Sequence, residues 1–262
     1  MLHALLAIPL GLAIGLSLGT LGGGGSILTV PALVYVLGES AGTATAGSLV
    51  IVGAASLAGA ASHARAGHVR WRAGSAFGLS GIVAAYLGSR LSTAVNPDVL
   101  LLAFAGLMVV AAAAMLLRRT TNPDGTPSTV KAEPRSRGGT ALRVLGAGLV
   151  VGFLTGFFGV GGGFVIVPGL VFALGYEMPV AVATSLLVIA VNTAVALVAR
   201  IGHTSFDVVV LVPFIVAAAA GALAGRRVAD RVSARALTRS FALLLLVIAA
   251  YVAVRAVSGL RG

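Results

Sequence analysis

Long runs of apolar residues, separated by short polar segments, make up most of the chain. Most of these runs approach the roughly 20 residues that a helix needs to cross a bilayer. Two of them, 26–37 and 164–174, are too short to cross without tilt or local thinning of the membrane. Residues 118–140 are polar and rich in Thr, Pro, Ser and Arg, which is typical of a linker. The predicted helices cover residues 2–20, 26–37, 42–61, 73–91, 98–117, 141–158, 164–174, 179–199, 206–224 and 234–257.

The composition also indicates a membrane protein. Of the 262 residues, 58% are hydrophobic and 10% are charged, whereas soluble domains carry about 25% charged residues. So few charges cannot cover a water-facing surface. The chain has no cysteine, which excludes disulfides, thiol catalysis and Cys-based metal sites. We therefore expect an all-α, polytopic transmembrane helical bundle that is embedded in the lipid bilayer.

The two halves of the chain repeat one another. When Gly24 is aligned with Gly161, a series of glycines and one proline fall on identical residues. The clearest matched segments are GGGGSILTVP at 22–31 and GVGGGFVIVP at 159–168. Internal repeats of this kind are common in transporters. The sequence therefore predicts a first transmembrane repeat at 1–117, a linker at 118–140 and a second transmembrane repeat at 141–262.

Positive charge is distributed differently in the two repeats. The net charge is +11, and the arginines gather in short loops, which is typical of a topology signal rather than of nucleic-acid binding. In the first repeat the basic loop follows the third run, and in the second it follows the fourth. Because basic short loops stay cytoplasmic, this pattern predicts two inverted repeats of about five segments each and a cytoplasmic linker. We also expect the first two helices of each repeat to pack against those of the other.

The two short runs each begin beside a cluster of glycines. Consecutive glycines hold a straight helix poorly, so each repeat is expected to contain a broken or re-entrant helix. The first N–H groups of a helix lack intrahelical partners and carry partial positive charge. Two such starts facing each other would bind an anion without a Lys or Arg in the hydrocarbon. The alternative interpretation is that the glycines only allow helices to pack closely.

Hydroxyl and amide side chains near the same places add candidate donors. Hydroxyl side chains at the starts of runs 42–61 and 179–199 can donate to a bound oxyanion. Alternatively, they form hydrogen bonds between helices, and both interpretations stay open. Neither catalytic nor metal-binding residues are expected, and no cofactor. The predicted substrate-binding residues are Gly24, Gly25, Ser26, Thr45, Ser48, Gly161, Gly162, Gly163, Thr184, Ser185 and Asn192.

Enzymatic activity has little support in the sequence. It contains no HExxH, GxSxG or Walker A motif. The Gly24-Gly25-Ser26 segment superficially resembles that of rhomboid proteases, but the nearest candidate bases, His63 and His203, lie at the ends of runs. Because ionisable residues sit at run ends, a proton relay at the membrane midplane is not indicated either.

At the two glycine motifs and the segments after them, the sequence resembles the sulfite exporter TauE/SafE family, also called the 4-toluene sulfonate uptake permease family. The resemblance rests on the duplicated Gly-x-Gly-Gly…Val-Pro-x-Leu segments and on the Ala-x-Ala-x-Ser-Leu segments that follow them. It implies membrane transport of sulfur-containing anions such as sulfite or organosulfonates. The two copies differ, because Ser26 and Thr29 in the first stand where the second has Gly163 and Ile166.

The resulting hypothesis is a secondary transporter of a small anion, either sulfite or an organosulfonate, in the cytoplasmic (inner) membrane of a bacterium. A passive anion channel is the first alternative, and a scaffold without transport is the second. Its partners would be the anionic substrate and the lipid bilayer. Nucleic acid is not expected as a partner, and a homodimer is compatible with the sequence.

Overall fold

The computed structural model describes residues 2–39, 41–92, 94–95, 97–117, 137–158, 163–198 and 208–260. All of these residues lie in helices or in short connections between them, which confirms the all-α prediction. Most of the predicted linker, at 118–136, lies outside the described residues. The helix after it begins at Arg137, so the linker ends earlier than the predicted residue 140.

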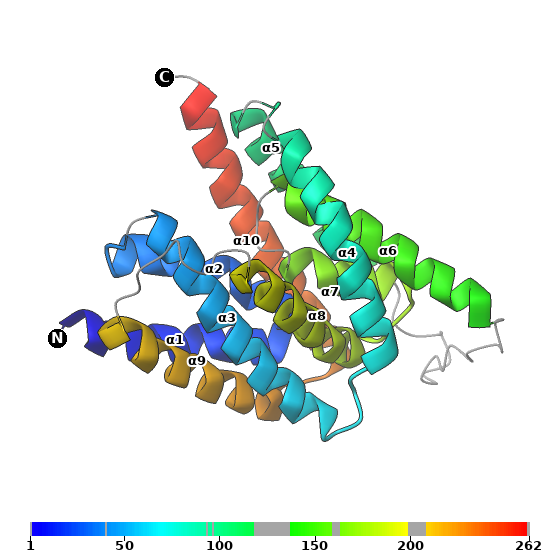
Figure 1. The fold of residues 1–262 in the computed structure, drawn as a ribbon, viewed down its shortest axis with the longest axis horizontal. Coiled ribbons are helices and arrows are strands. Elements are labelled where there is room, and N and C mark those ends of the chain that lie inside the picture. The colour runs from blue at the N-terminus through cyan, green and yellow to red at the C-terminus, as the bar shows by residue number, and fades with distance from the viewer. Residues whose placement is uncertain are drawn as a thin grey trace.

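Each predicted run corresponds to a helical element (Figure 1). The run at 26–37 is divided, because a regular α-helix gives way to a wider π turn after Pro31. The elements are α1 (Leu2–Leu21), the 3-10 turn η1 (Gly22–Gly25), α2 (Ser26–Pro31), the π turn η2 (Ala32–Val36), α3 (Ala41–Ala64), α4 (Trp71–Ser92), α5 (Pro97–Leu117), α6 (Arg137–Phe158), α7 (Gly163–Ala173), α8 (Met178–Val198), α9 (Val208–Ala229) and α10 (Ala234–Leu260).

Seven segments in the described part of the chain are long and apolar enough to cross a membrane. They confirm a polytopic membrane protein. The first, Leu6–Val34, runs from α1 into η2, and the other six are parts of α3, α5, α6, α8, α9 and α10. Helix α4 is 22 residues long but less apolar, and α7, at 11 residues, is too short to cross unaided.

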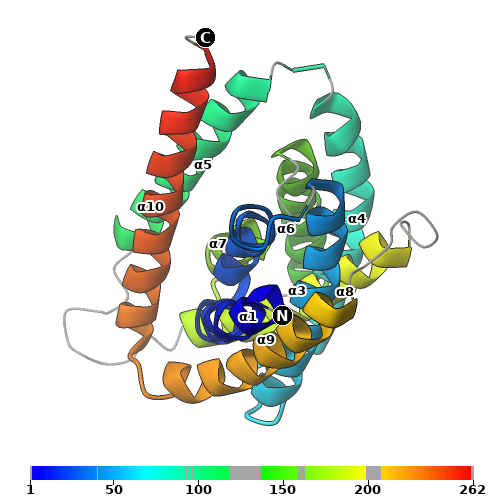
Figure 2. The same cartoon turned by 90° about the vertical axis from the view of Figure 1, so that its left-hand side faces the viewer.

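The helices pair across the two repeats. Helix α1 packs along α9, and α6 packs along α4, so the first helix of each repeat lies on the fourth helix of the other (Figure 1). Helix α3 packs against its counterpart α8, and α5 against α10, which Figure 2 shows on one side of the molecule. The expected contact between the first two helices of the two repeats is therefore made by the short segments, since η1 and α2 contact α7, whereas α1 and α6 pack on α9 and α4.

Glycines allow the close approach of the two cross-repeat pairs. A Cβ atom placed on Gly15 would overlap the backbone carbonyl of Ala218 in α9. In the equivalent pair, a Cβ on Gly152 would overlap the backbone of Gly81 in α4. Lipid tails are as apolar as helix surfaces, so close backbone packing of this kind is what holds helices together in a membrane.

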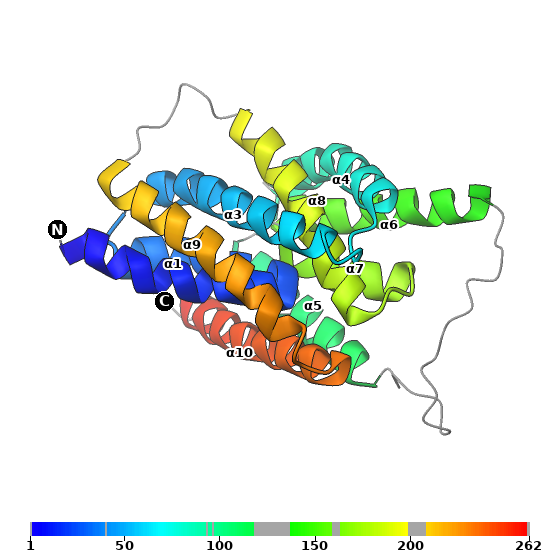
Figure 3. The same cartoon turned by 90° about the horizontal axis from the view of Figure 1, so that it is seen from below.

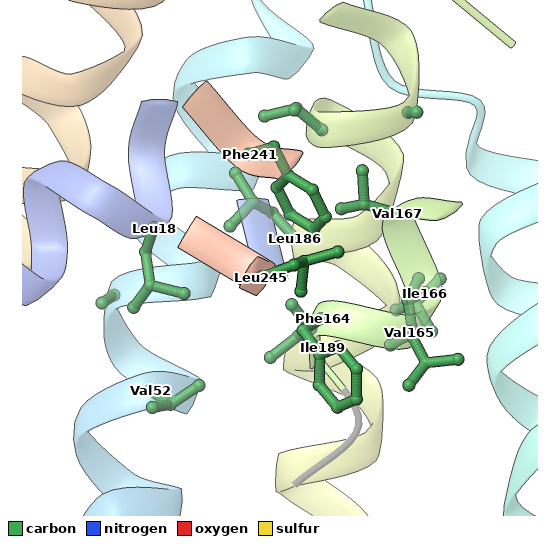
Figure 4. Close-up of a cluster of buried hydrophobic side chains, with 14 of the residues drawn as sticks. Leu18, Val52, Phe164, Val165, Ile166, Val167, Leu186, Ile189, Phe241 and Leu245 are labelled. Carbon is green, nitrogen blue, oxygen red and sulfur yellow. The ribbon is translucent and has the colours of Figure 1, made fainter. Parts of the chain in front are cut away.

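The core is centred on the short helix α7 and on α8. Residues Gly163 to Pro168 of α7 are all buried, as are Ala181 to Ile189 of α8. Side chains from α1, α3 and α10 complete the cluster around them, including Leu18, Val52 and Phe241 (Figure 4). Figure 3 shows α7 beside α8 and α6 from a further direction. A helix that is apolar on all sides belongs in such an interior.

Candidate functional site

The chain reverses direction at the glycine cluster of the first repeat. Helix α1 ends at Leu21, and Gly22 has φ +67°, a left-handed conformation that favours glycine. A Cβ on Gly25 would lie 2.7 Å from the backbone nitrogen of Leu18 and 2.9 Å from the carbonyl oxygen of Ile14. In a straight helix, residues 14 and 25 would be about 16 Å apart. The helix is therefore broken at Gly22, and the chain returns alongside α1.

The second repeat shows the same return. A Cβ on Gly169 of α7 would lie 2.6 Å from the Val151 side chain of α6, so α7 runs back along α6. The connection between these helices, residues 159–162, lies outside the described residues. In both repeats the short helix that follows the glycine cluster therefore contacts the helix before it.

The starts of these two short segments meet in the interior. A Cβ on Gly23 would overlap the carbonyl group of Gly163, and a Cβ on Gly163 would lie 2.9 Å from the Gly23 oxygen. Ser26 adds its Oγ beside Gly163, and Ser185 of α8 places its Oγ 2.5 Å from a Cβ built on Gly22. We call Gly22, Gly23, Ser26, Gly163 and Ser185 the glycine junction. All except Ser26 are buried.

The two serine hydroxyls of the junction are held by backbone carbonyl groups. Ser26 donates to the Gly23 oxygen at 2.7 Å, and Ser185 donates to the Val182 oxygen at 2.8 Å. Both carbonyl groups lie three residues earlier in the chain, so each bond is local and the hydroxyl can rotate away from it. The junction therefore combines helix starts with two neutral donors that can turn toward an oxyanion.

The neighbouring glycines of the first motif face other helices. A Cβ on Gly24 would lie 3.0 Å from the side chain of Leu244 and 3.4 Å from that of Phe241, both on α10, whereas Gly25 faces α1. The predicted binding residues Gly161 and Gly162 lie outside the described residues.

Thr184 is turned toward the start of α4. Its Oγ1 accepts a hydrogen bond from the Arg70 backbone N–H at 3.3 Å, and its methyl group lies 3.1 Å from a Cβ built on Gly74.

Arg70 also influences Tyr176 in the turn after α7. Burial raises the pKa of the Tyr176 hydroxyl above its usual value, and the positive charge of Arg70 opposes this. The tyrosine therefore stays neutral at physiological pH, and this region fixes α4 to α8.

The remaining predicted donors have no described contact with the junction. Ser48 is buried on α3 and donates to the Thr45 carbonyl at 2.8 Å. The Oδ1 of Asn192 is buried without a hydrogen-bond partner among the described residues and lies 3.6 Å from a Cβ built on Gly78 of α4. Asn192 therefore faces the α4 side of α8.

The structure also contains a partly buried polar cluster that the sequence did not indicate. His63, at the end of α3, is 2% exposed, and its Nε2 lies 3.1 Å from the Gly19 carbonyl oxygen in the last turns of α1. Because a carbonyl only accepts, Nε2 carries the proton of this bond. Arg226 of α9 donates a hydrogen bond to the backbone carbonyl oxygen of Ser62 at 2.7 Å, and its Nε forms an ion pair with the Asp230 carboxylate at 3.3 Å. The cluster fastens α1, α3 and α9 together near the glycine junction.

A metal centre finds no support here, since no group of three or more His, Asp or Glu in the residues described could hold an ion. The buried polar side-chain atoms of the described residues belong to hydroxyls, to the amide of Asn192 and to the cluster around His63. This inventory suits the binding of a small ligand through neutral donors.

Comparison with known proteins places the chain among membrane transporters. Residues 7–252 match the family described as "Sulfite exporter TauE/SafE". A "Probable membrane transporter protein" of Xylella fastidiosa strain 9a5c is 35% identical over 242 residues, covering 91% of this chain and 90% of the relative. The "Probable membrane transporter protein YdhB" of Bacillus subtilis strain 168 is 28% identical over 214 residues, covering 82% of this chain and 85% of the relative. No solved structure matches the chain.

Proposed function

Because the chain belongs to the sulfite exporter TauE/SafE family of membrane transporters, we propose that it is a secondary transporter of a small anion, sulfite or an organosulfonate. It is a transporter rather than an enzyme. The observation that supports the proposed substrate class is the contact of Gly23 with Gly163, which brings two broken-helix starts together in the interior. We assign the protein to the bacterial cytoplasmic membrane.

The proposed site binds the anion without a full positive charge. Backbone N–H groups at the starts of η1 and α7 supply partial positive charge, and Ser26 and Ser185 supply rotatable hydroxyls. Binding through neutral donors is weaker than binding to an Arg or Lys, which favours release of the cargo. Thr45, Ser48, Thr184 and Asn192 belong to this proposal only if α3 and α8 turn during transport.

In this structure the two glycine segments touch, so an anion can enter only after they separate. The cross-repeat pairing suggests how they separate. Since α1 packs along α9 and α6 along α4, we propose that each pair moves as one body and that the pairs rock against each other. Such rocking would open the glycine junction first to one side of the membrane and then to the other.

Inverted repeats with re-entrant α2 and α7 complete this proposal. The reversed loop charges and the reciprocal pairing of the helices both support it. A reporter fused at residue 130 is expected to lie in the cytoplasm, so that fused green fluorescent protein fluoresces and fused alkaline phosphatase stays inactive. Active phosphatase at this position would contradict the inverted arrangement.

The substrate and the transport mode are tested together in proteoliposomes. A thermal-shift screen of sulfite, sulfate, taurine, sulfoacetate and thiosulfate first selects the ligand. A carrier shows saturable counterflow of that ligand, because its site faces one side at a time. Flux without counterflow would instead identify a passive anion channel, and the absence of both flux and ligand stabilisation would identify a scaffold.

Replacing Ser185 with alanine is expected to weaken binding of the selected anion roughly two- to tenfold. The change removes one donor, and one hydrogen bond contributes about 0.5–1.5 kcal/mol. Titration of the thermal shift gives the affinity. Ser56→Ala is the matched control, since Ser56 is also fully buried but lies on α3 without a described contact to the junction. Equal affinities for the two variants would move the anion away from Ser185.

A further inference from the structure

A large apolar cavity lies between α5, α6 and α7, and its inner end reaches Phe164, the residue that follows Gly163 of the glycine junction. Its volume is about 550 Å³, within the roughly 300–1,000 Å³ usual for small-molecule sites. The lining is almost entirely aliphatic and aromatic, and Arg143 is its one charged residue. We call it the α5–α7 groove. Residues that define its two ends and its walls are Arg143, Ala114, Ala111, Leu107, Leu154 and Phe164.

The groove has the length of one membrane leaflet. Arg143 is the third residue of the candidate span Ala141–Phe158, so it lies near one edge of the membrane. Leu154 lines the opposite end. Along a helix these two residues are about 16 Å apart, close to half of the roughly 30 Å hydrocarbon core. The groove therefore extends from the membrane edge to about the midplane, where Phe164 adjoins Gly163 of the junction.

The α5 wall of the groove is built from small side chains where the other repeat has larger ones. Ala111 and Ala114 form part of its α5 wall. When the repeats are aligned as Gly24 with Gly161, the corresponding residues of α10 are Ile248 and Tyr251. The matching wall in the other repeat thus carries larger side chains.

The charge at the mouth belongs to the same repeat. Leu6 occupies the position of Arg143 in the first repeat, so both the small wall and the cation occur in the second. The Arg143 side chain is exposed, and the one salt bridge recorded among the described residues joins Arg226 to Asp230. A guanidinium group without a described carboxylate partner is well suited to a phosphate, which it can contact through two parallel N–H groups.

We propose that the α5–α7 groove binds an anionic phospholipid, with an acyl chain along the groove and the phosphate at Arg143. Basic pockets between transmembrane helices bind anionic headgroups in this way. The leaflet-length apolar channel fits an acyl chain, and the single cation at the membrane edge matches a headgroup. This inference requires only that the protein lies in a membrane, so it does not rest on the proposed transport of an anion.

Native mass spectrometry of the full chain tests the proposal directly. The purified protein is mixed with equal amounts of phosphatidylglycerol and phosphatidylcholine that carry identical acyl chains. The wild-type protein is expected to retain phosphatidylglycerol preferentially. Arg143→Gln is expected to reduce that preference about fivefold, the effect of one cation near the membrane surface. Arg227→Gln, which removes an exposed arginine at the end of α9, is expected to keep the wild-type preference.

A second variant tests the apolar part of the groove. Ala111→Ile introduces the side chain of the other repeat and is expected to lower retention of both lipids severalfold, with the size-exclusion profile unchanged. Equal retention of the two lipids by the wild-type protein would overturn the proposal. So would the same preference in Arg143→Gln as in Arg227→Gln, or a lipid-free dimer that covers the groove.

Discussion

Replacing Gly23 with alanine is expected to abolish most transport while the protein still inserts into the membrane. A Cβ at this position would overlap the carbonyl group of Gly163, and both partners are backbone atoms, so relief requires the two segments to move apart. Overpacking of this kind costs about 1–3 kcal/mol. If this cost raises the free energy of the state in which the two segments touch, the initial uptake rate in proteoliposomes drops about 5- to 150-fold.

The control for this variant is Gly106→Ala in α5. No heavy atom lies within 4 Å of a Cβ built on Gly106, so the same chemical change meets no obstacle there. Uptake by Gly106→Ala should equal that of the wild-type protein at the same reconstituted amount. Wild-type uptake by Gly23→Ala as well would show that transport does not depend on the contact between the two motifs.

Replacing Gly15 with leucine is expected to prevent stable folding. A Cβ at Gly15 would already overlap the backbone of Ala218, and the larger leucine side chain cannot be placed without separating α1 from α9. Because this pair is one of the two most extensive helix contacts between the repeats, the penalty should exceed the usual 1–3 kcal/mol of overpacking and reach about 4 kcal/mol or more. Fluorescence-detected size exclusion should show loss of the monodisperse peak.

The equivalent change in the other pair should have the same outcome. Gly152→Leu would press against the backbone of Gly81 and separate α6 from α4. Gly106→Leu, on an exposed face of α5, should leave the elution profile unchanged. A monodisperse, thermally stable Gly15→Leu protein would show that the α1–α9 contact is not needed for folding.

The helices themselves were predictable from the sequence, because the hydrocarbon core imposes a length and requires every backbone polar group to be satisfied. Even the two short helices could be placed, since runs of apolar residues that follow glycine clusters cannot continue a straight helix. The repeat identified by Gly24 and Gly161 also indicated which segments had matching positions. Element ends moved by a few residues, and the linker boundary moved to Arg137.

The candidate site was predictable only in part. The sequence indicated that the two glycine motifs come together, and the structure brings Gly23 and Gly163 into contact. It could not indicate that Thr184 faces Arg70 or that Gly24 faces α10, because successive residues of a helix point in directions about 100° apart. The orientation of each side chain depends on how its helix is rotated in the bundle.

The sequence by itself determined that this chain is an all-α membrane protein of two related halves, with a broken helix in the first and a matching short helix in the second. Only the tertiary structure decided that α1 pairs with α9 and α6 with α4, and that His63 is buried at the end of α3. The physical reason is the lipid environment. Between helices surrounded by hydrocarbon there is little hydrophobic driving force, so apolar sequence does not select the partner. Partners are selected by how closely two backbones fit, and that fit exists only when both helices are in place.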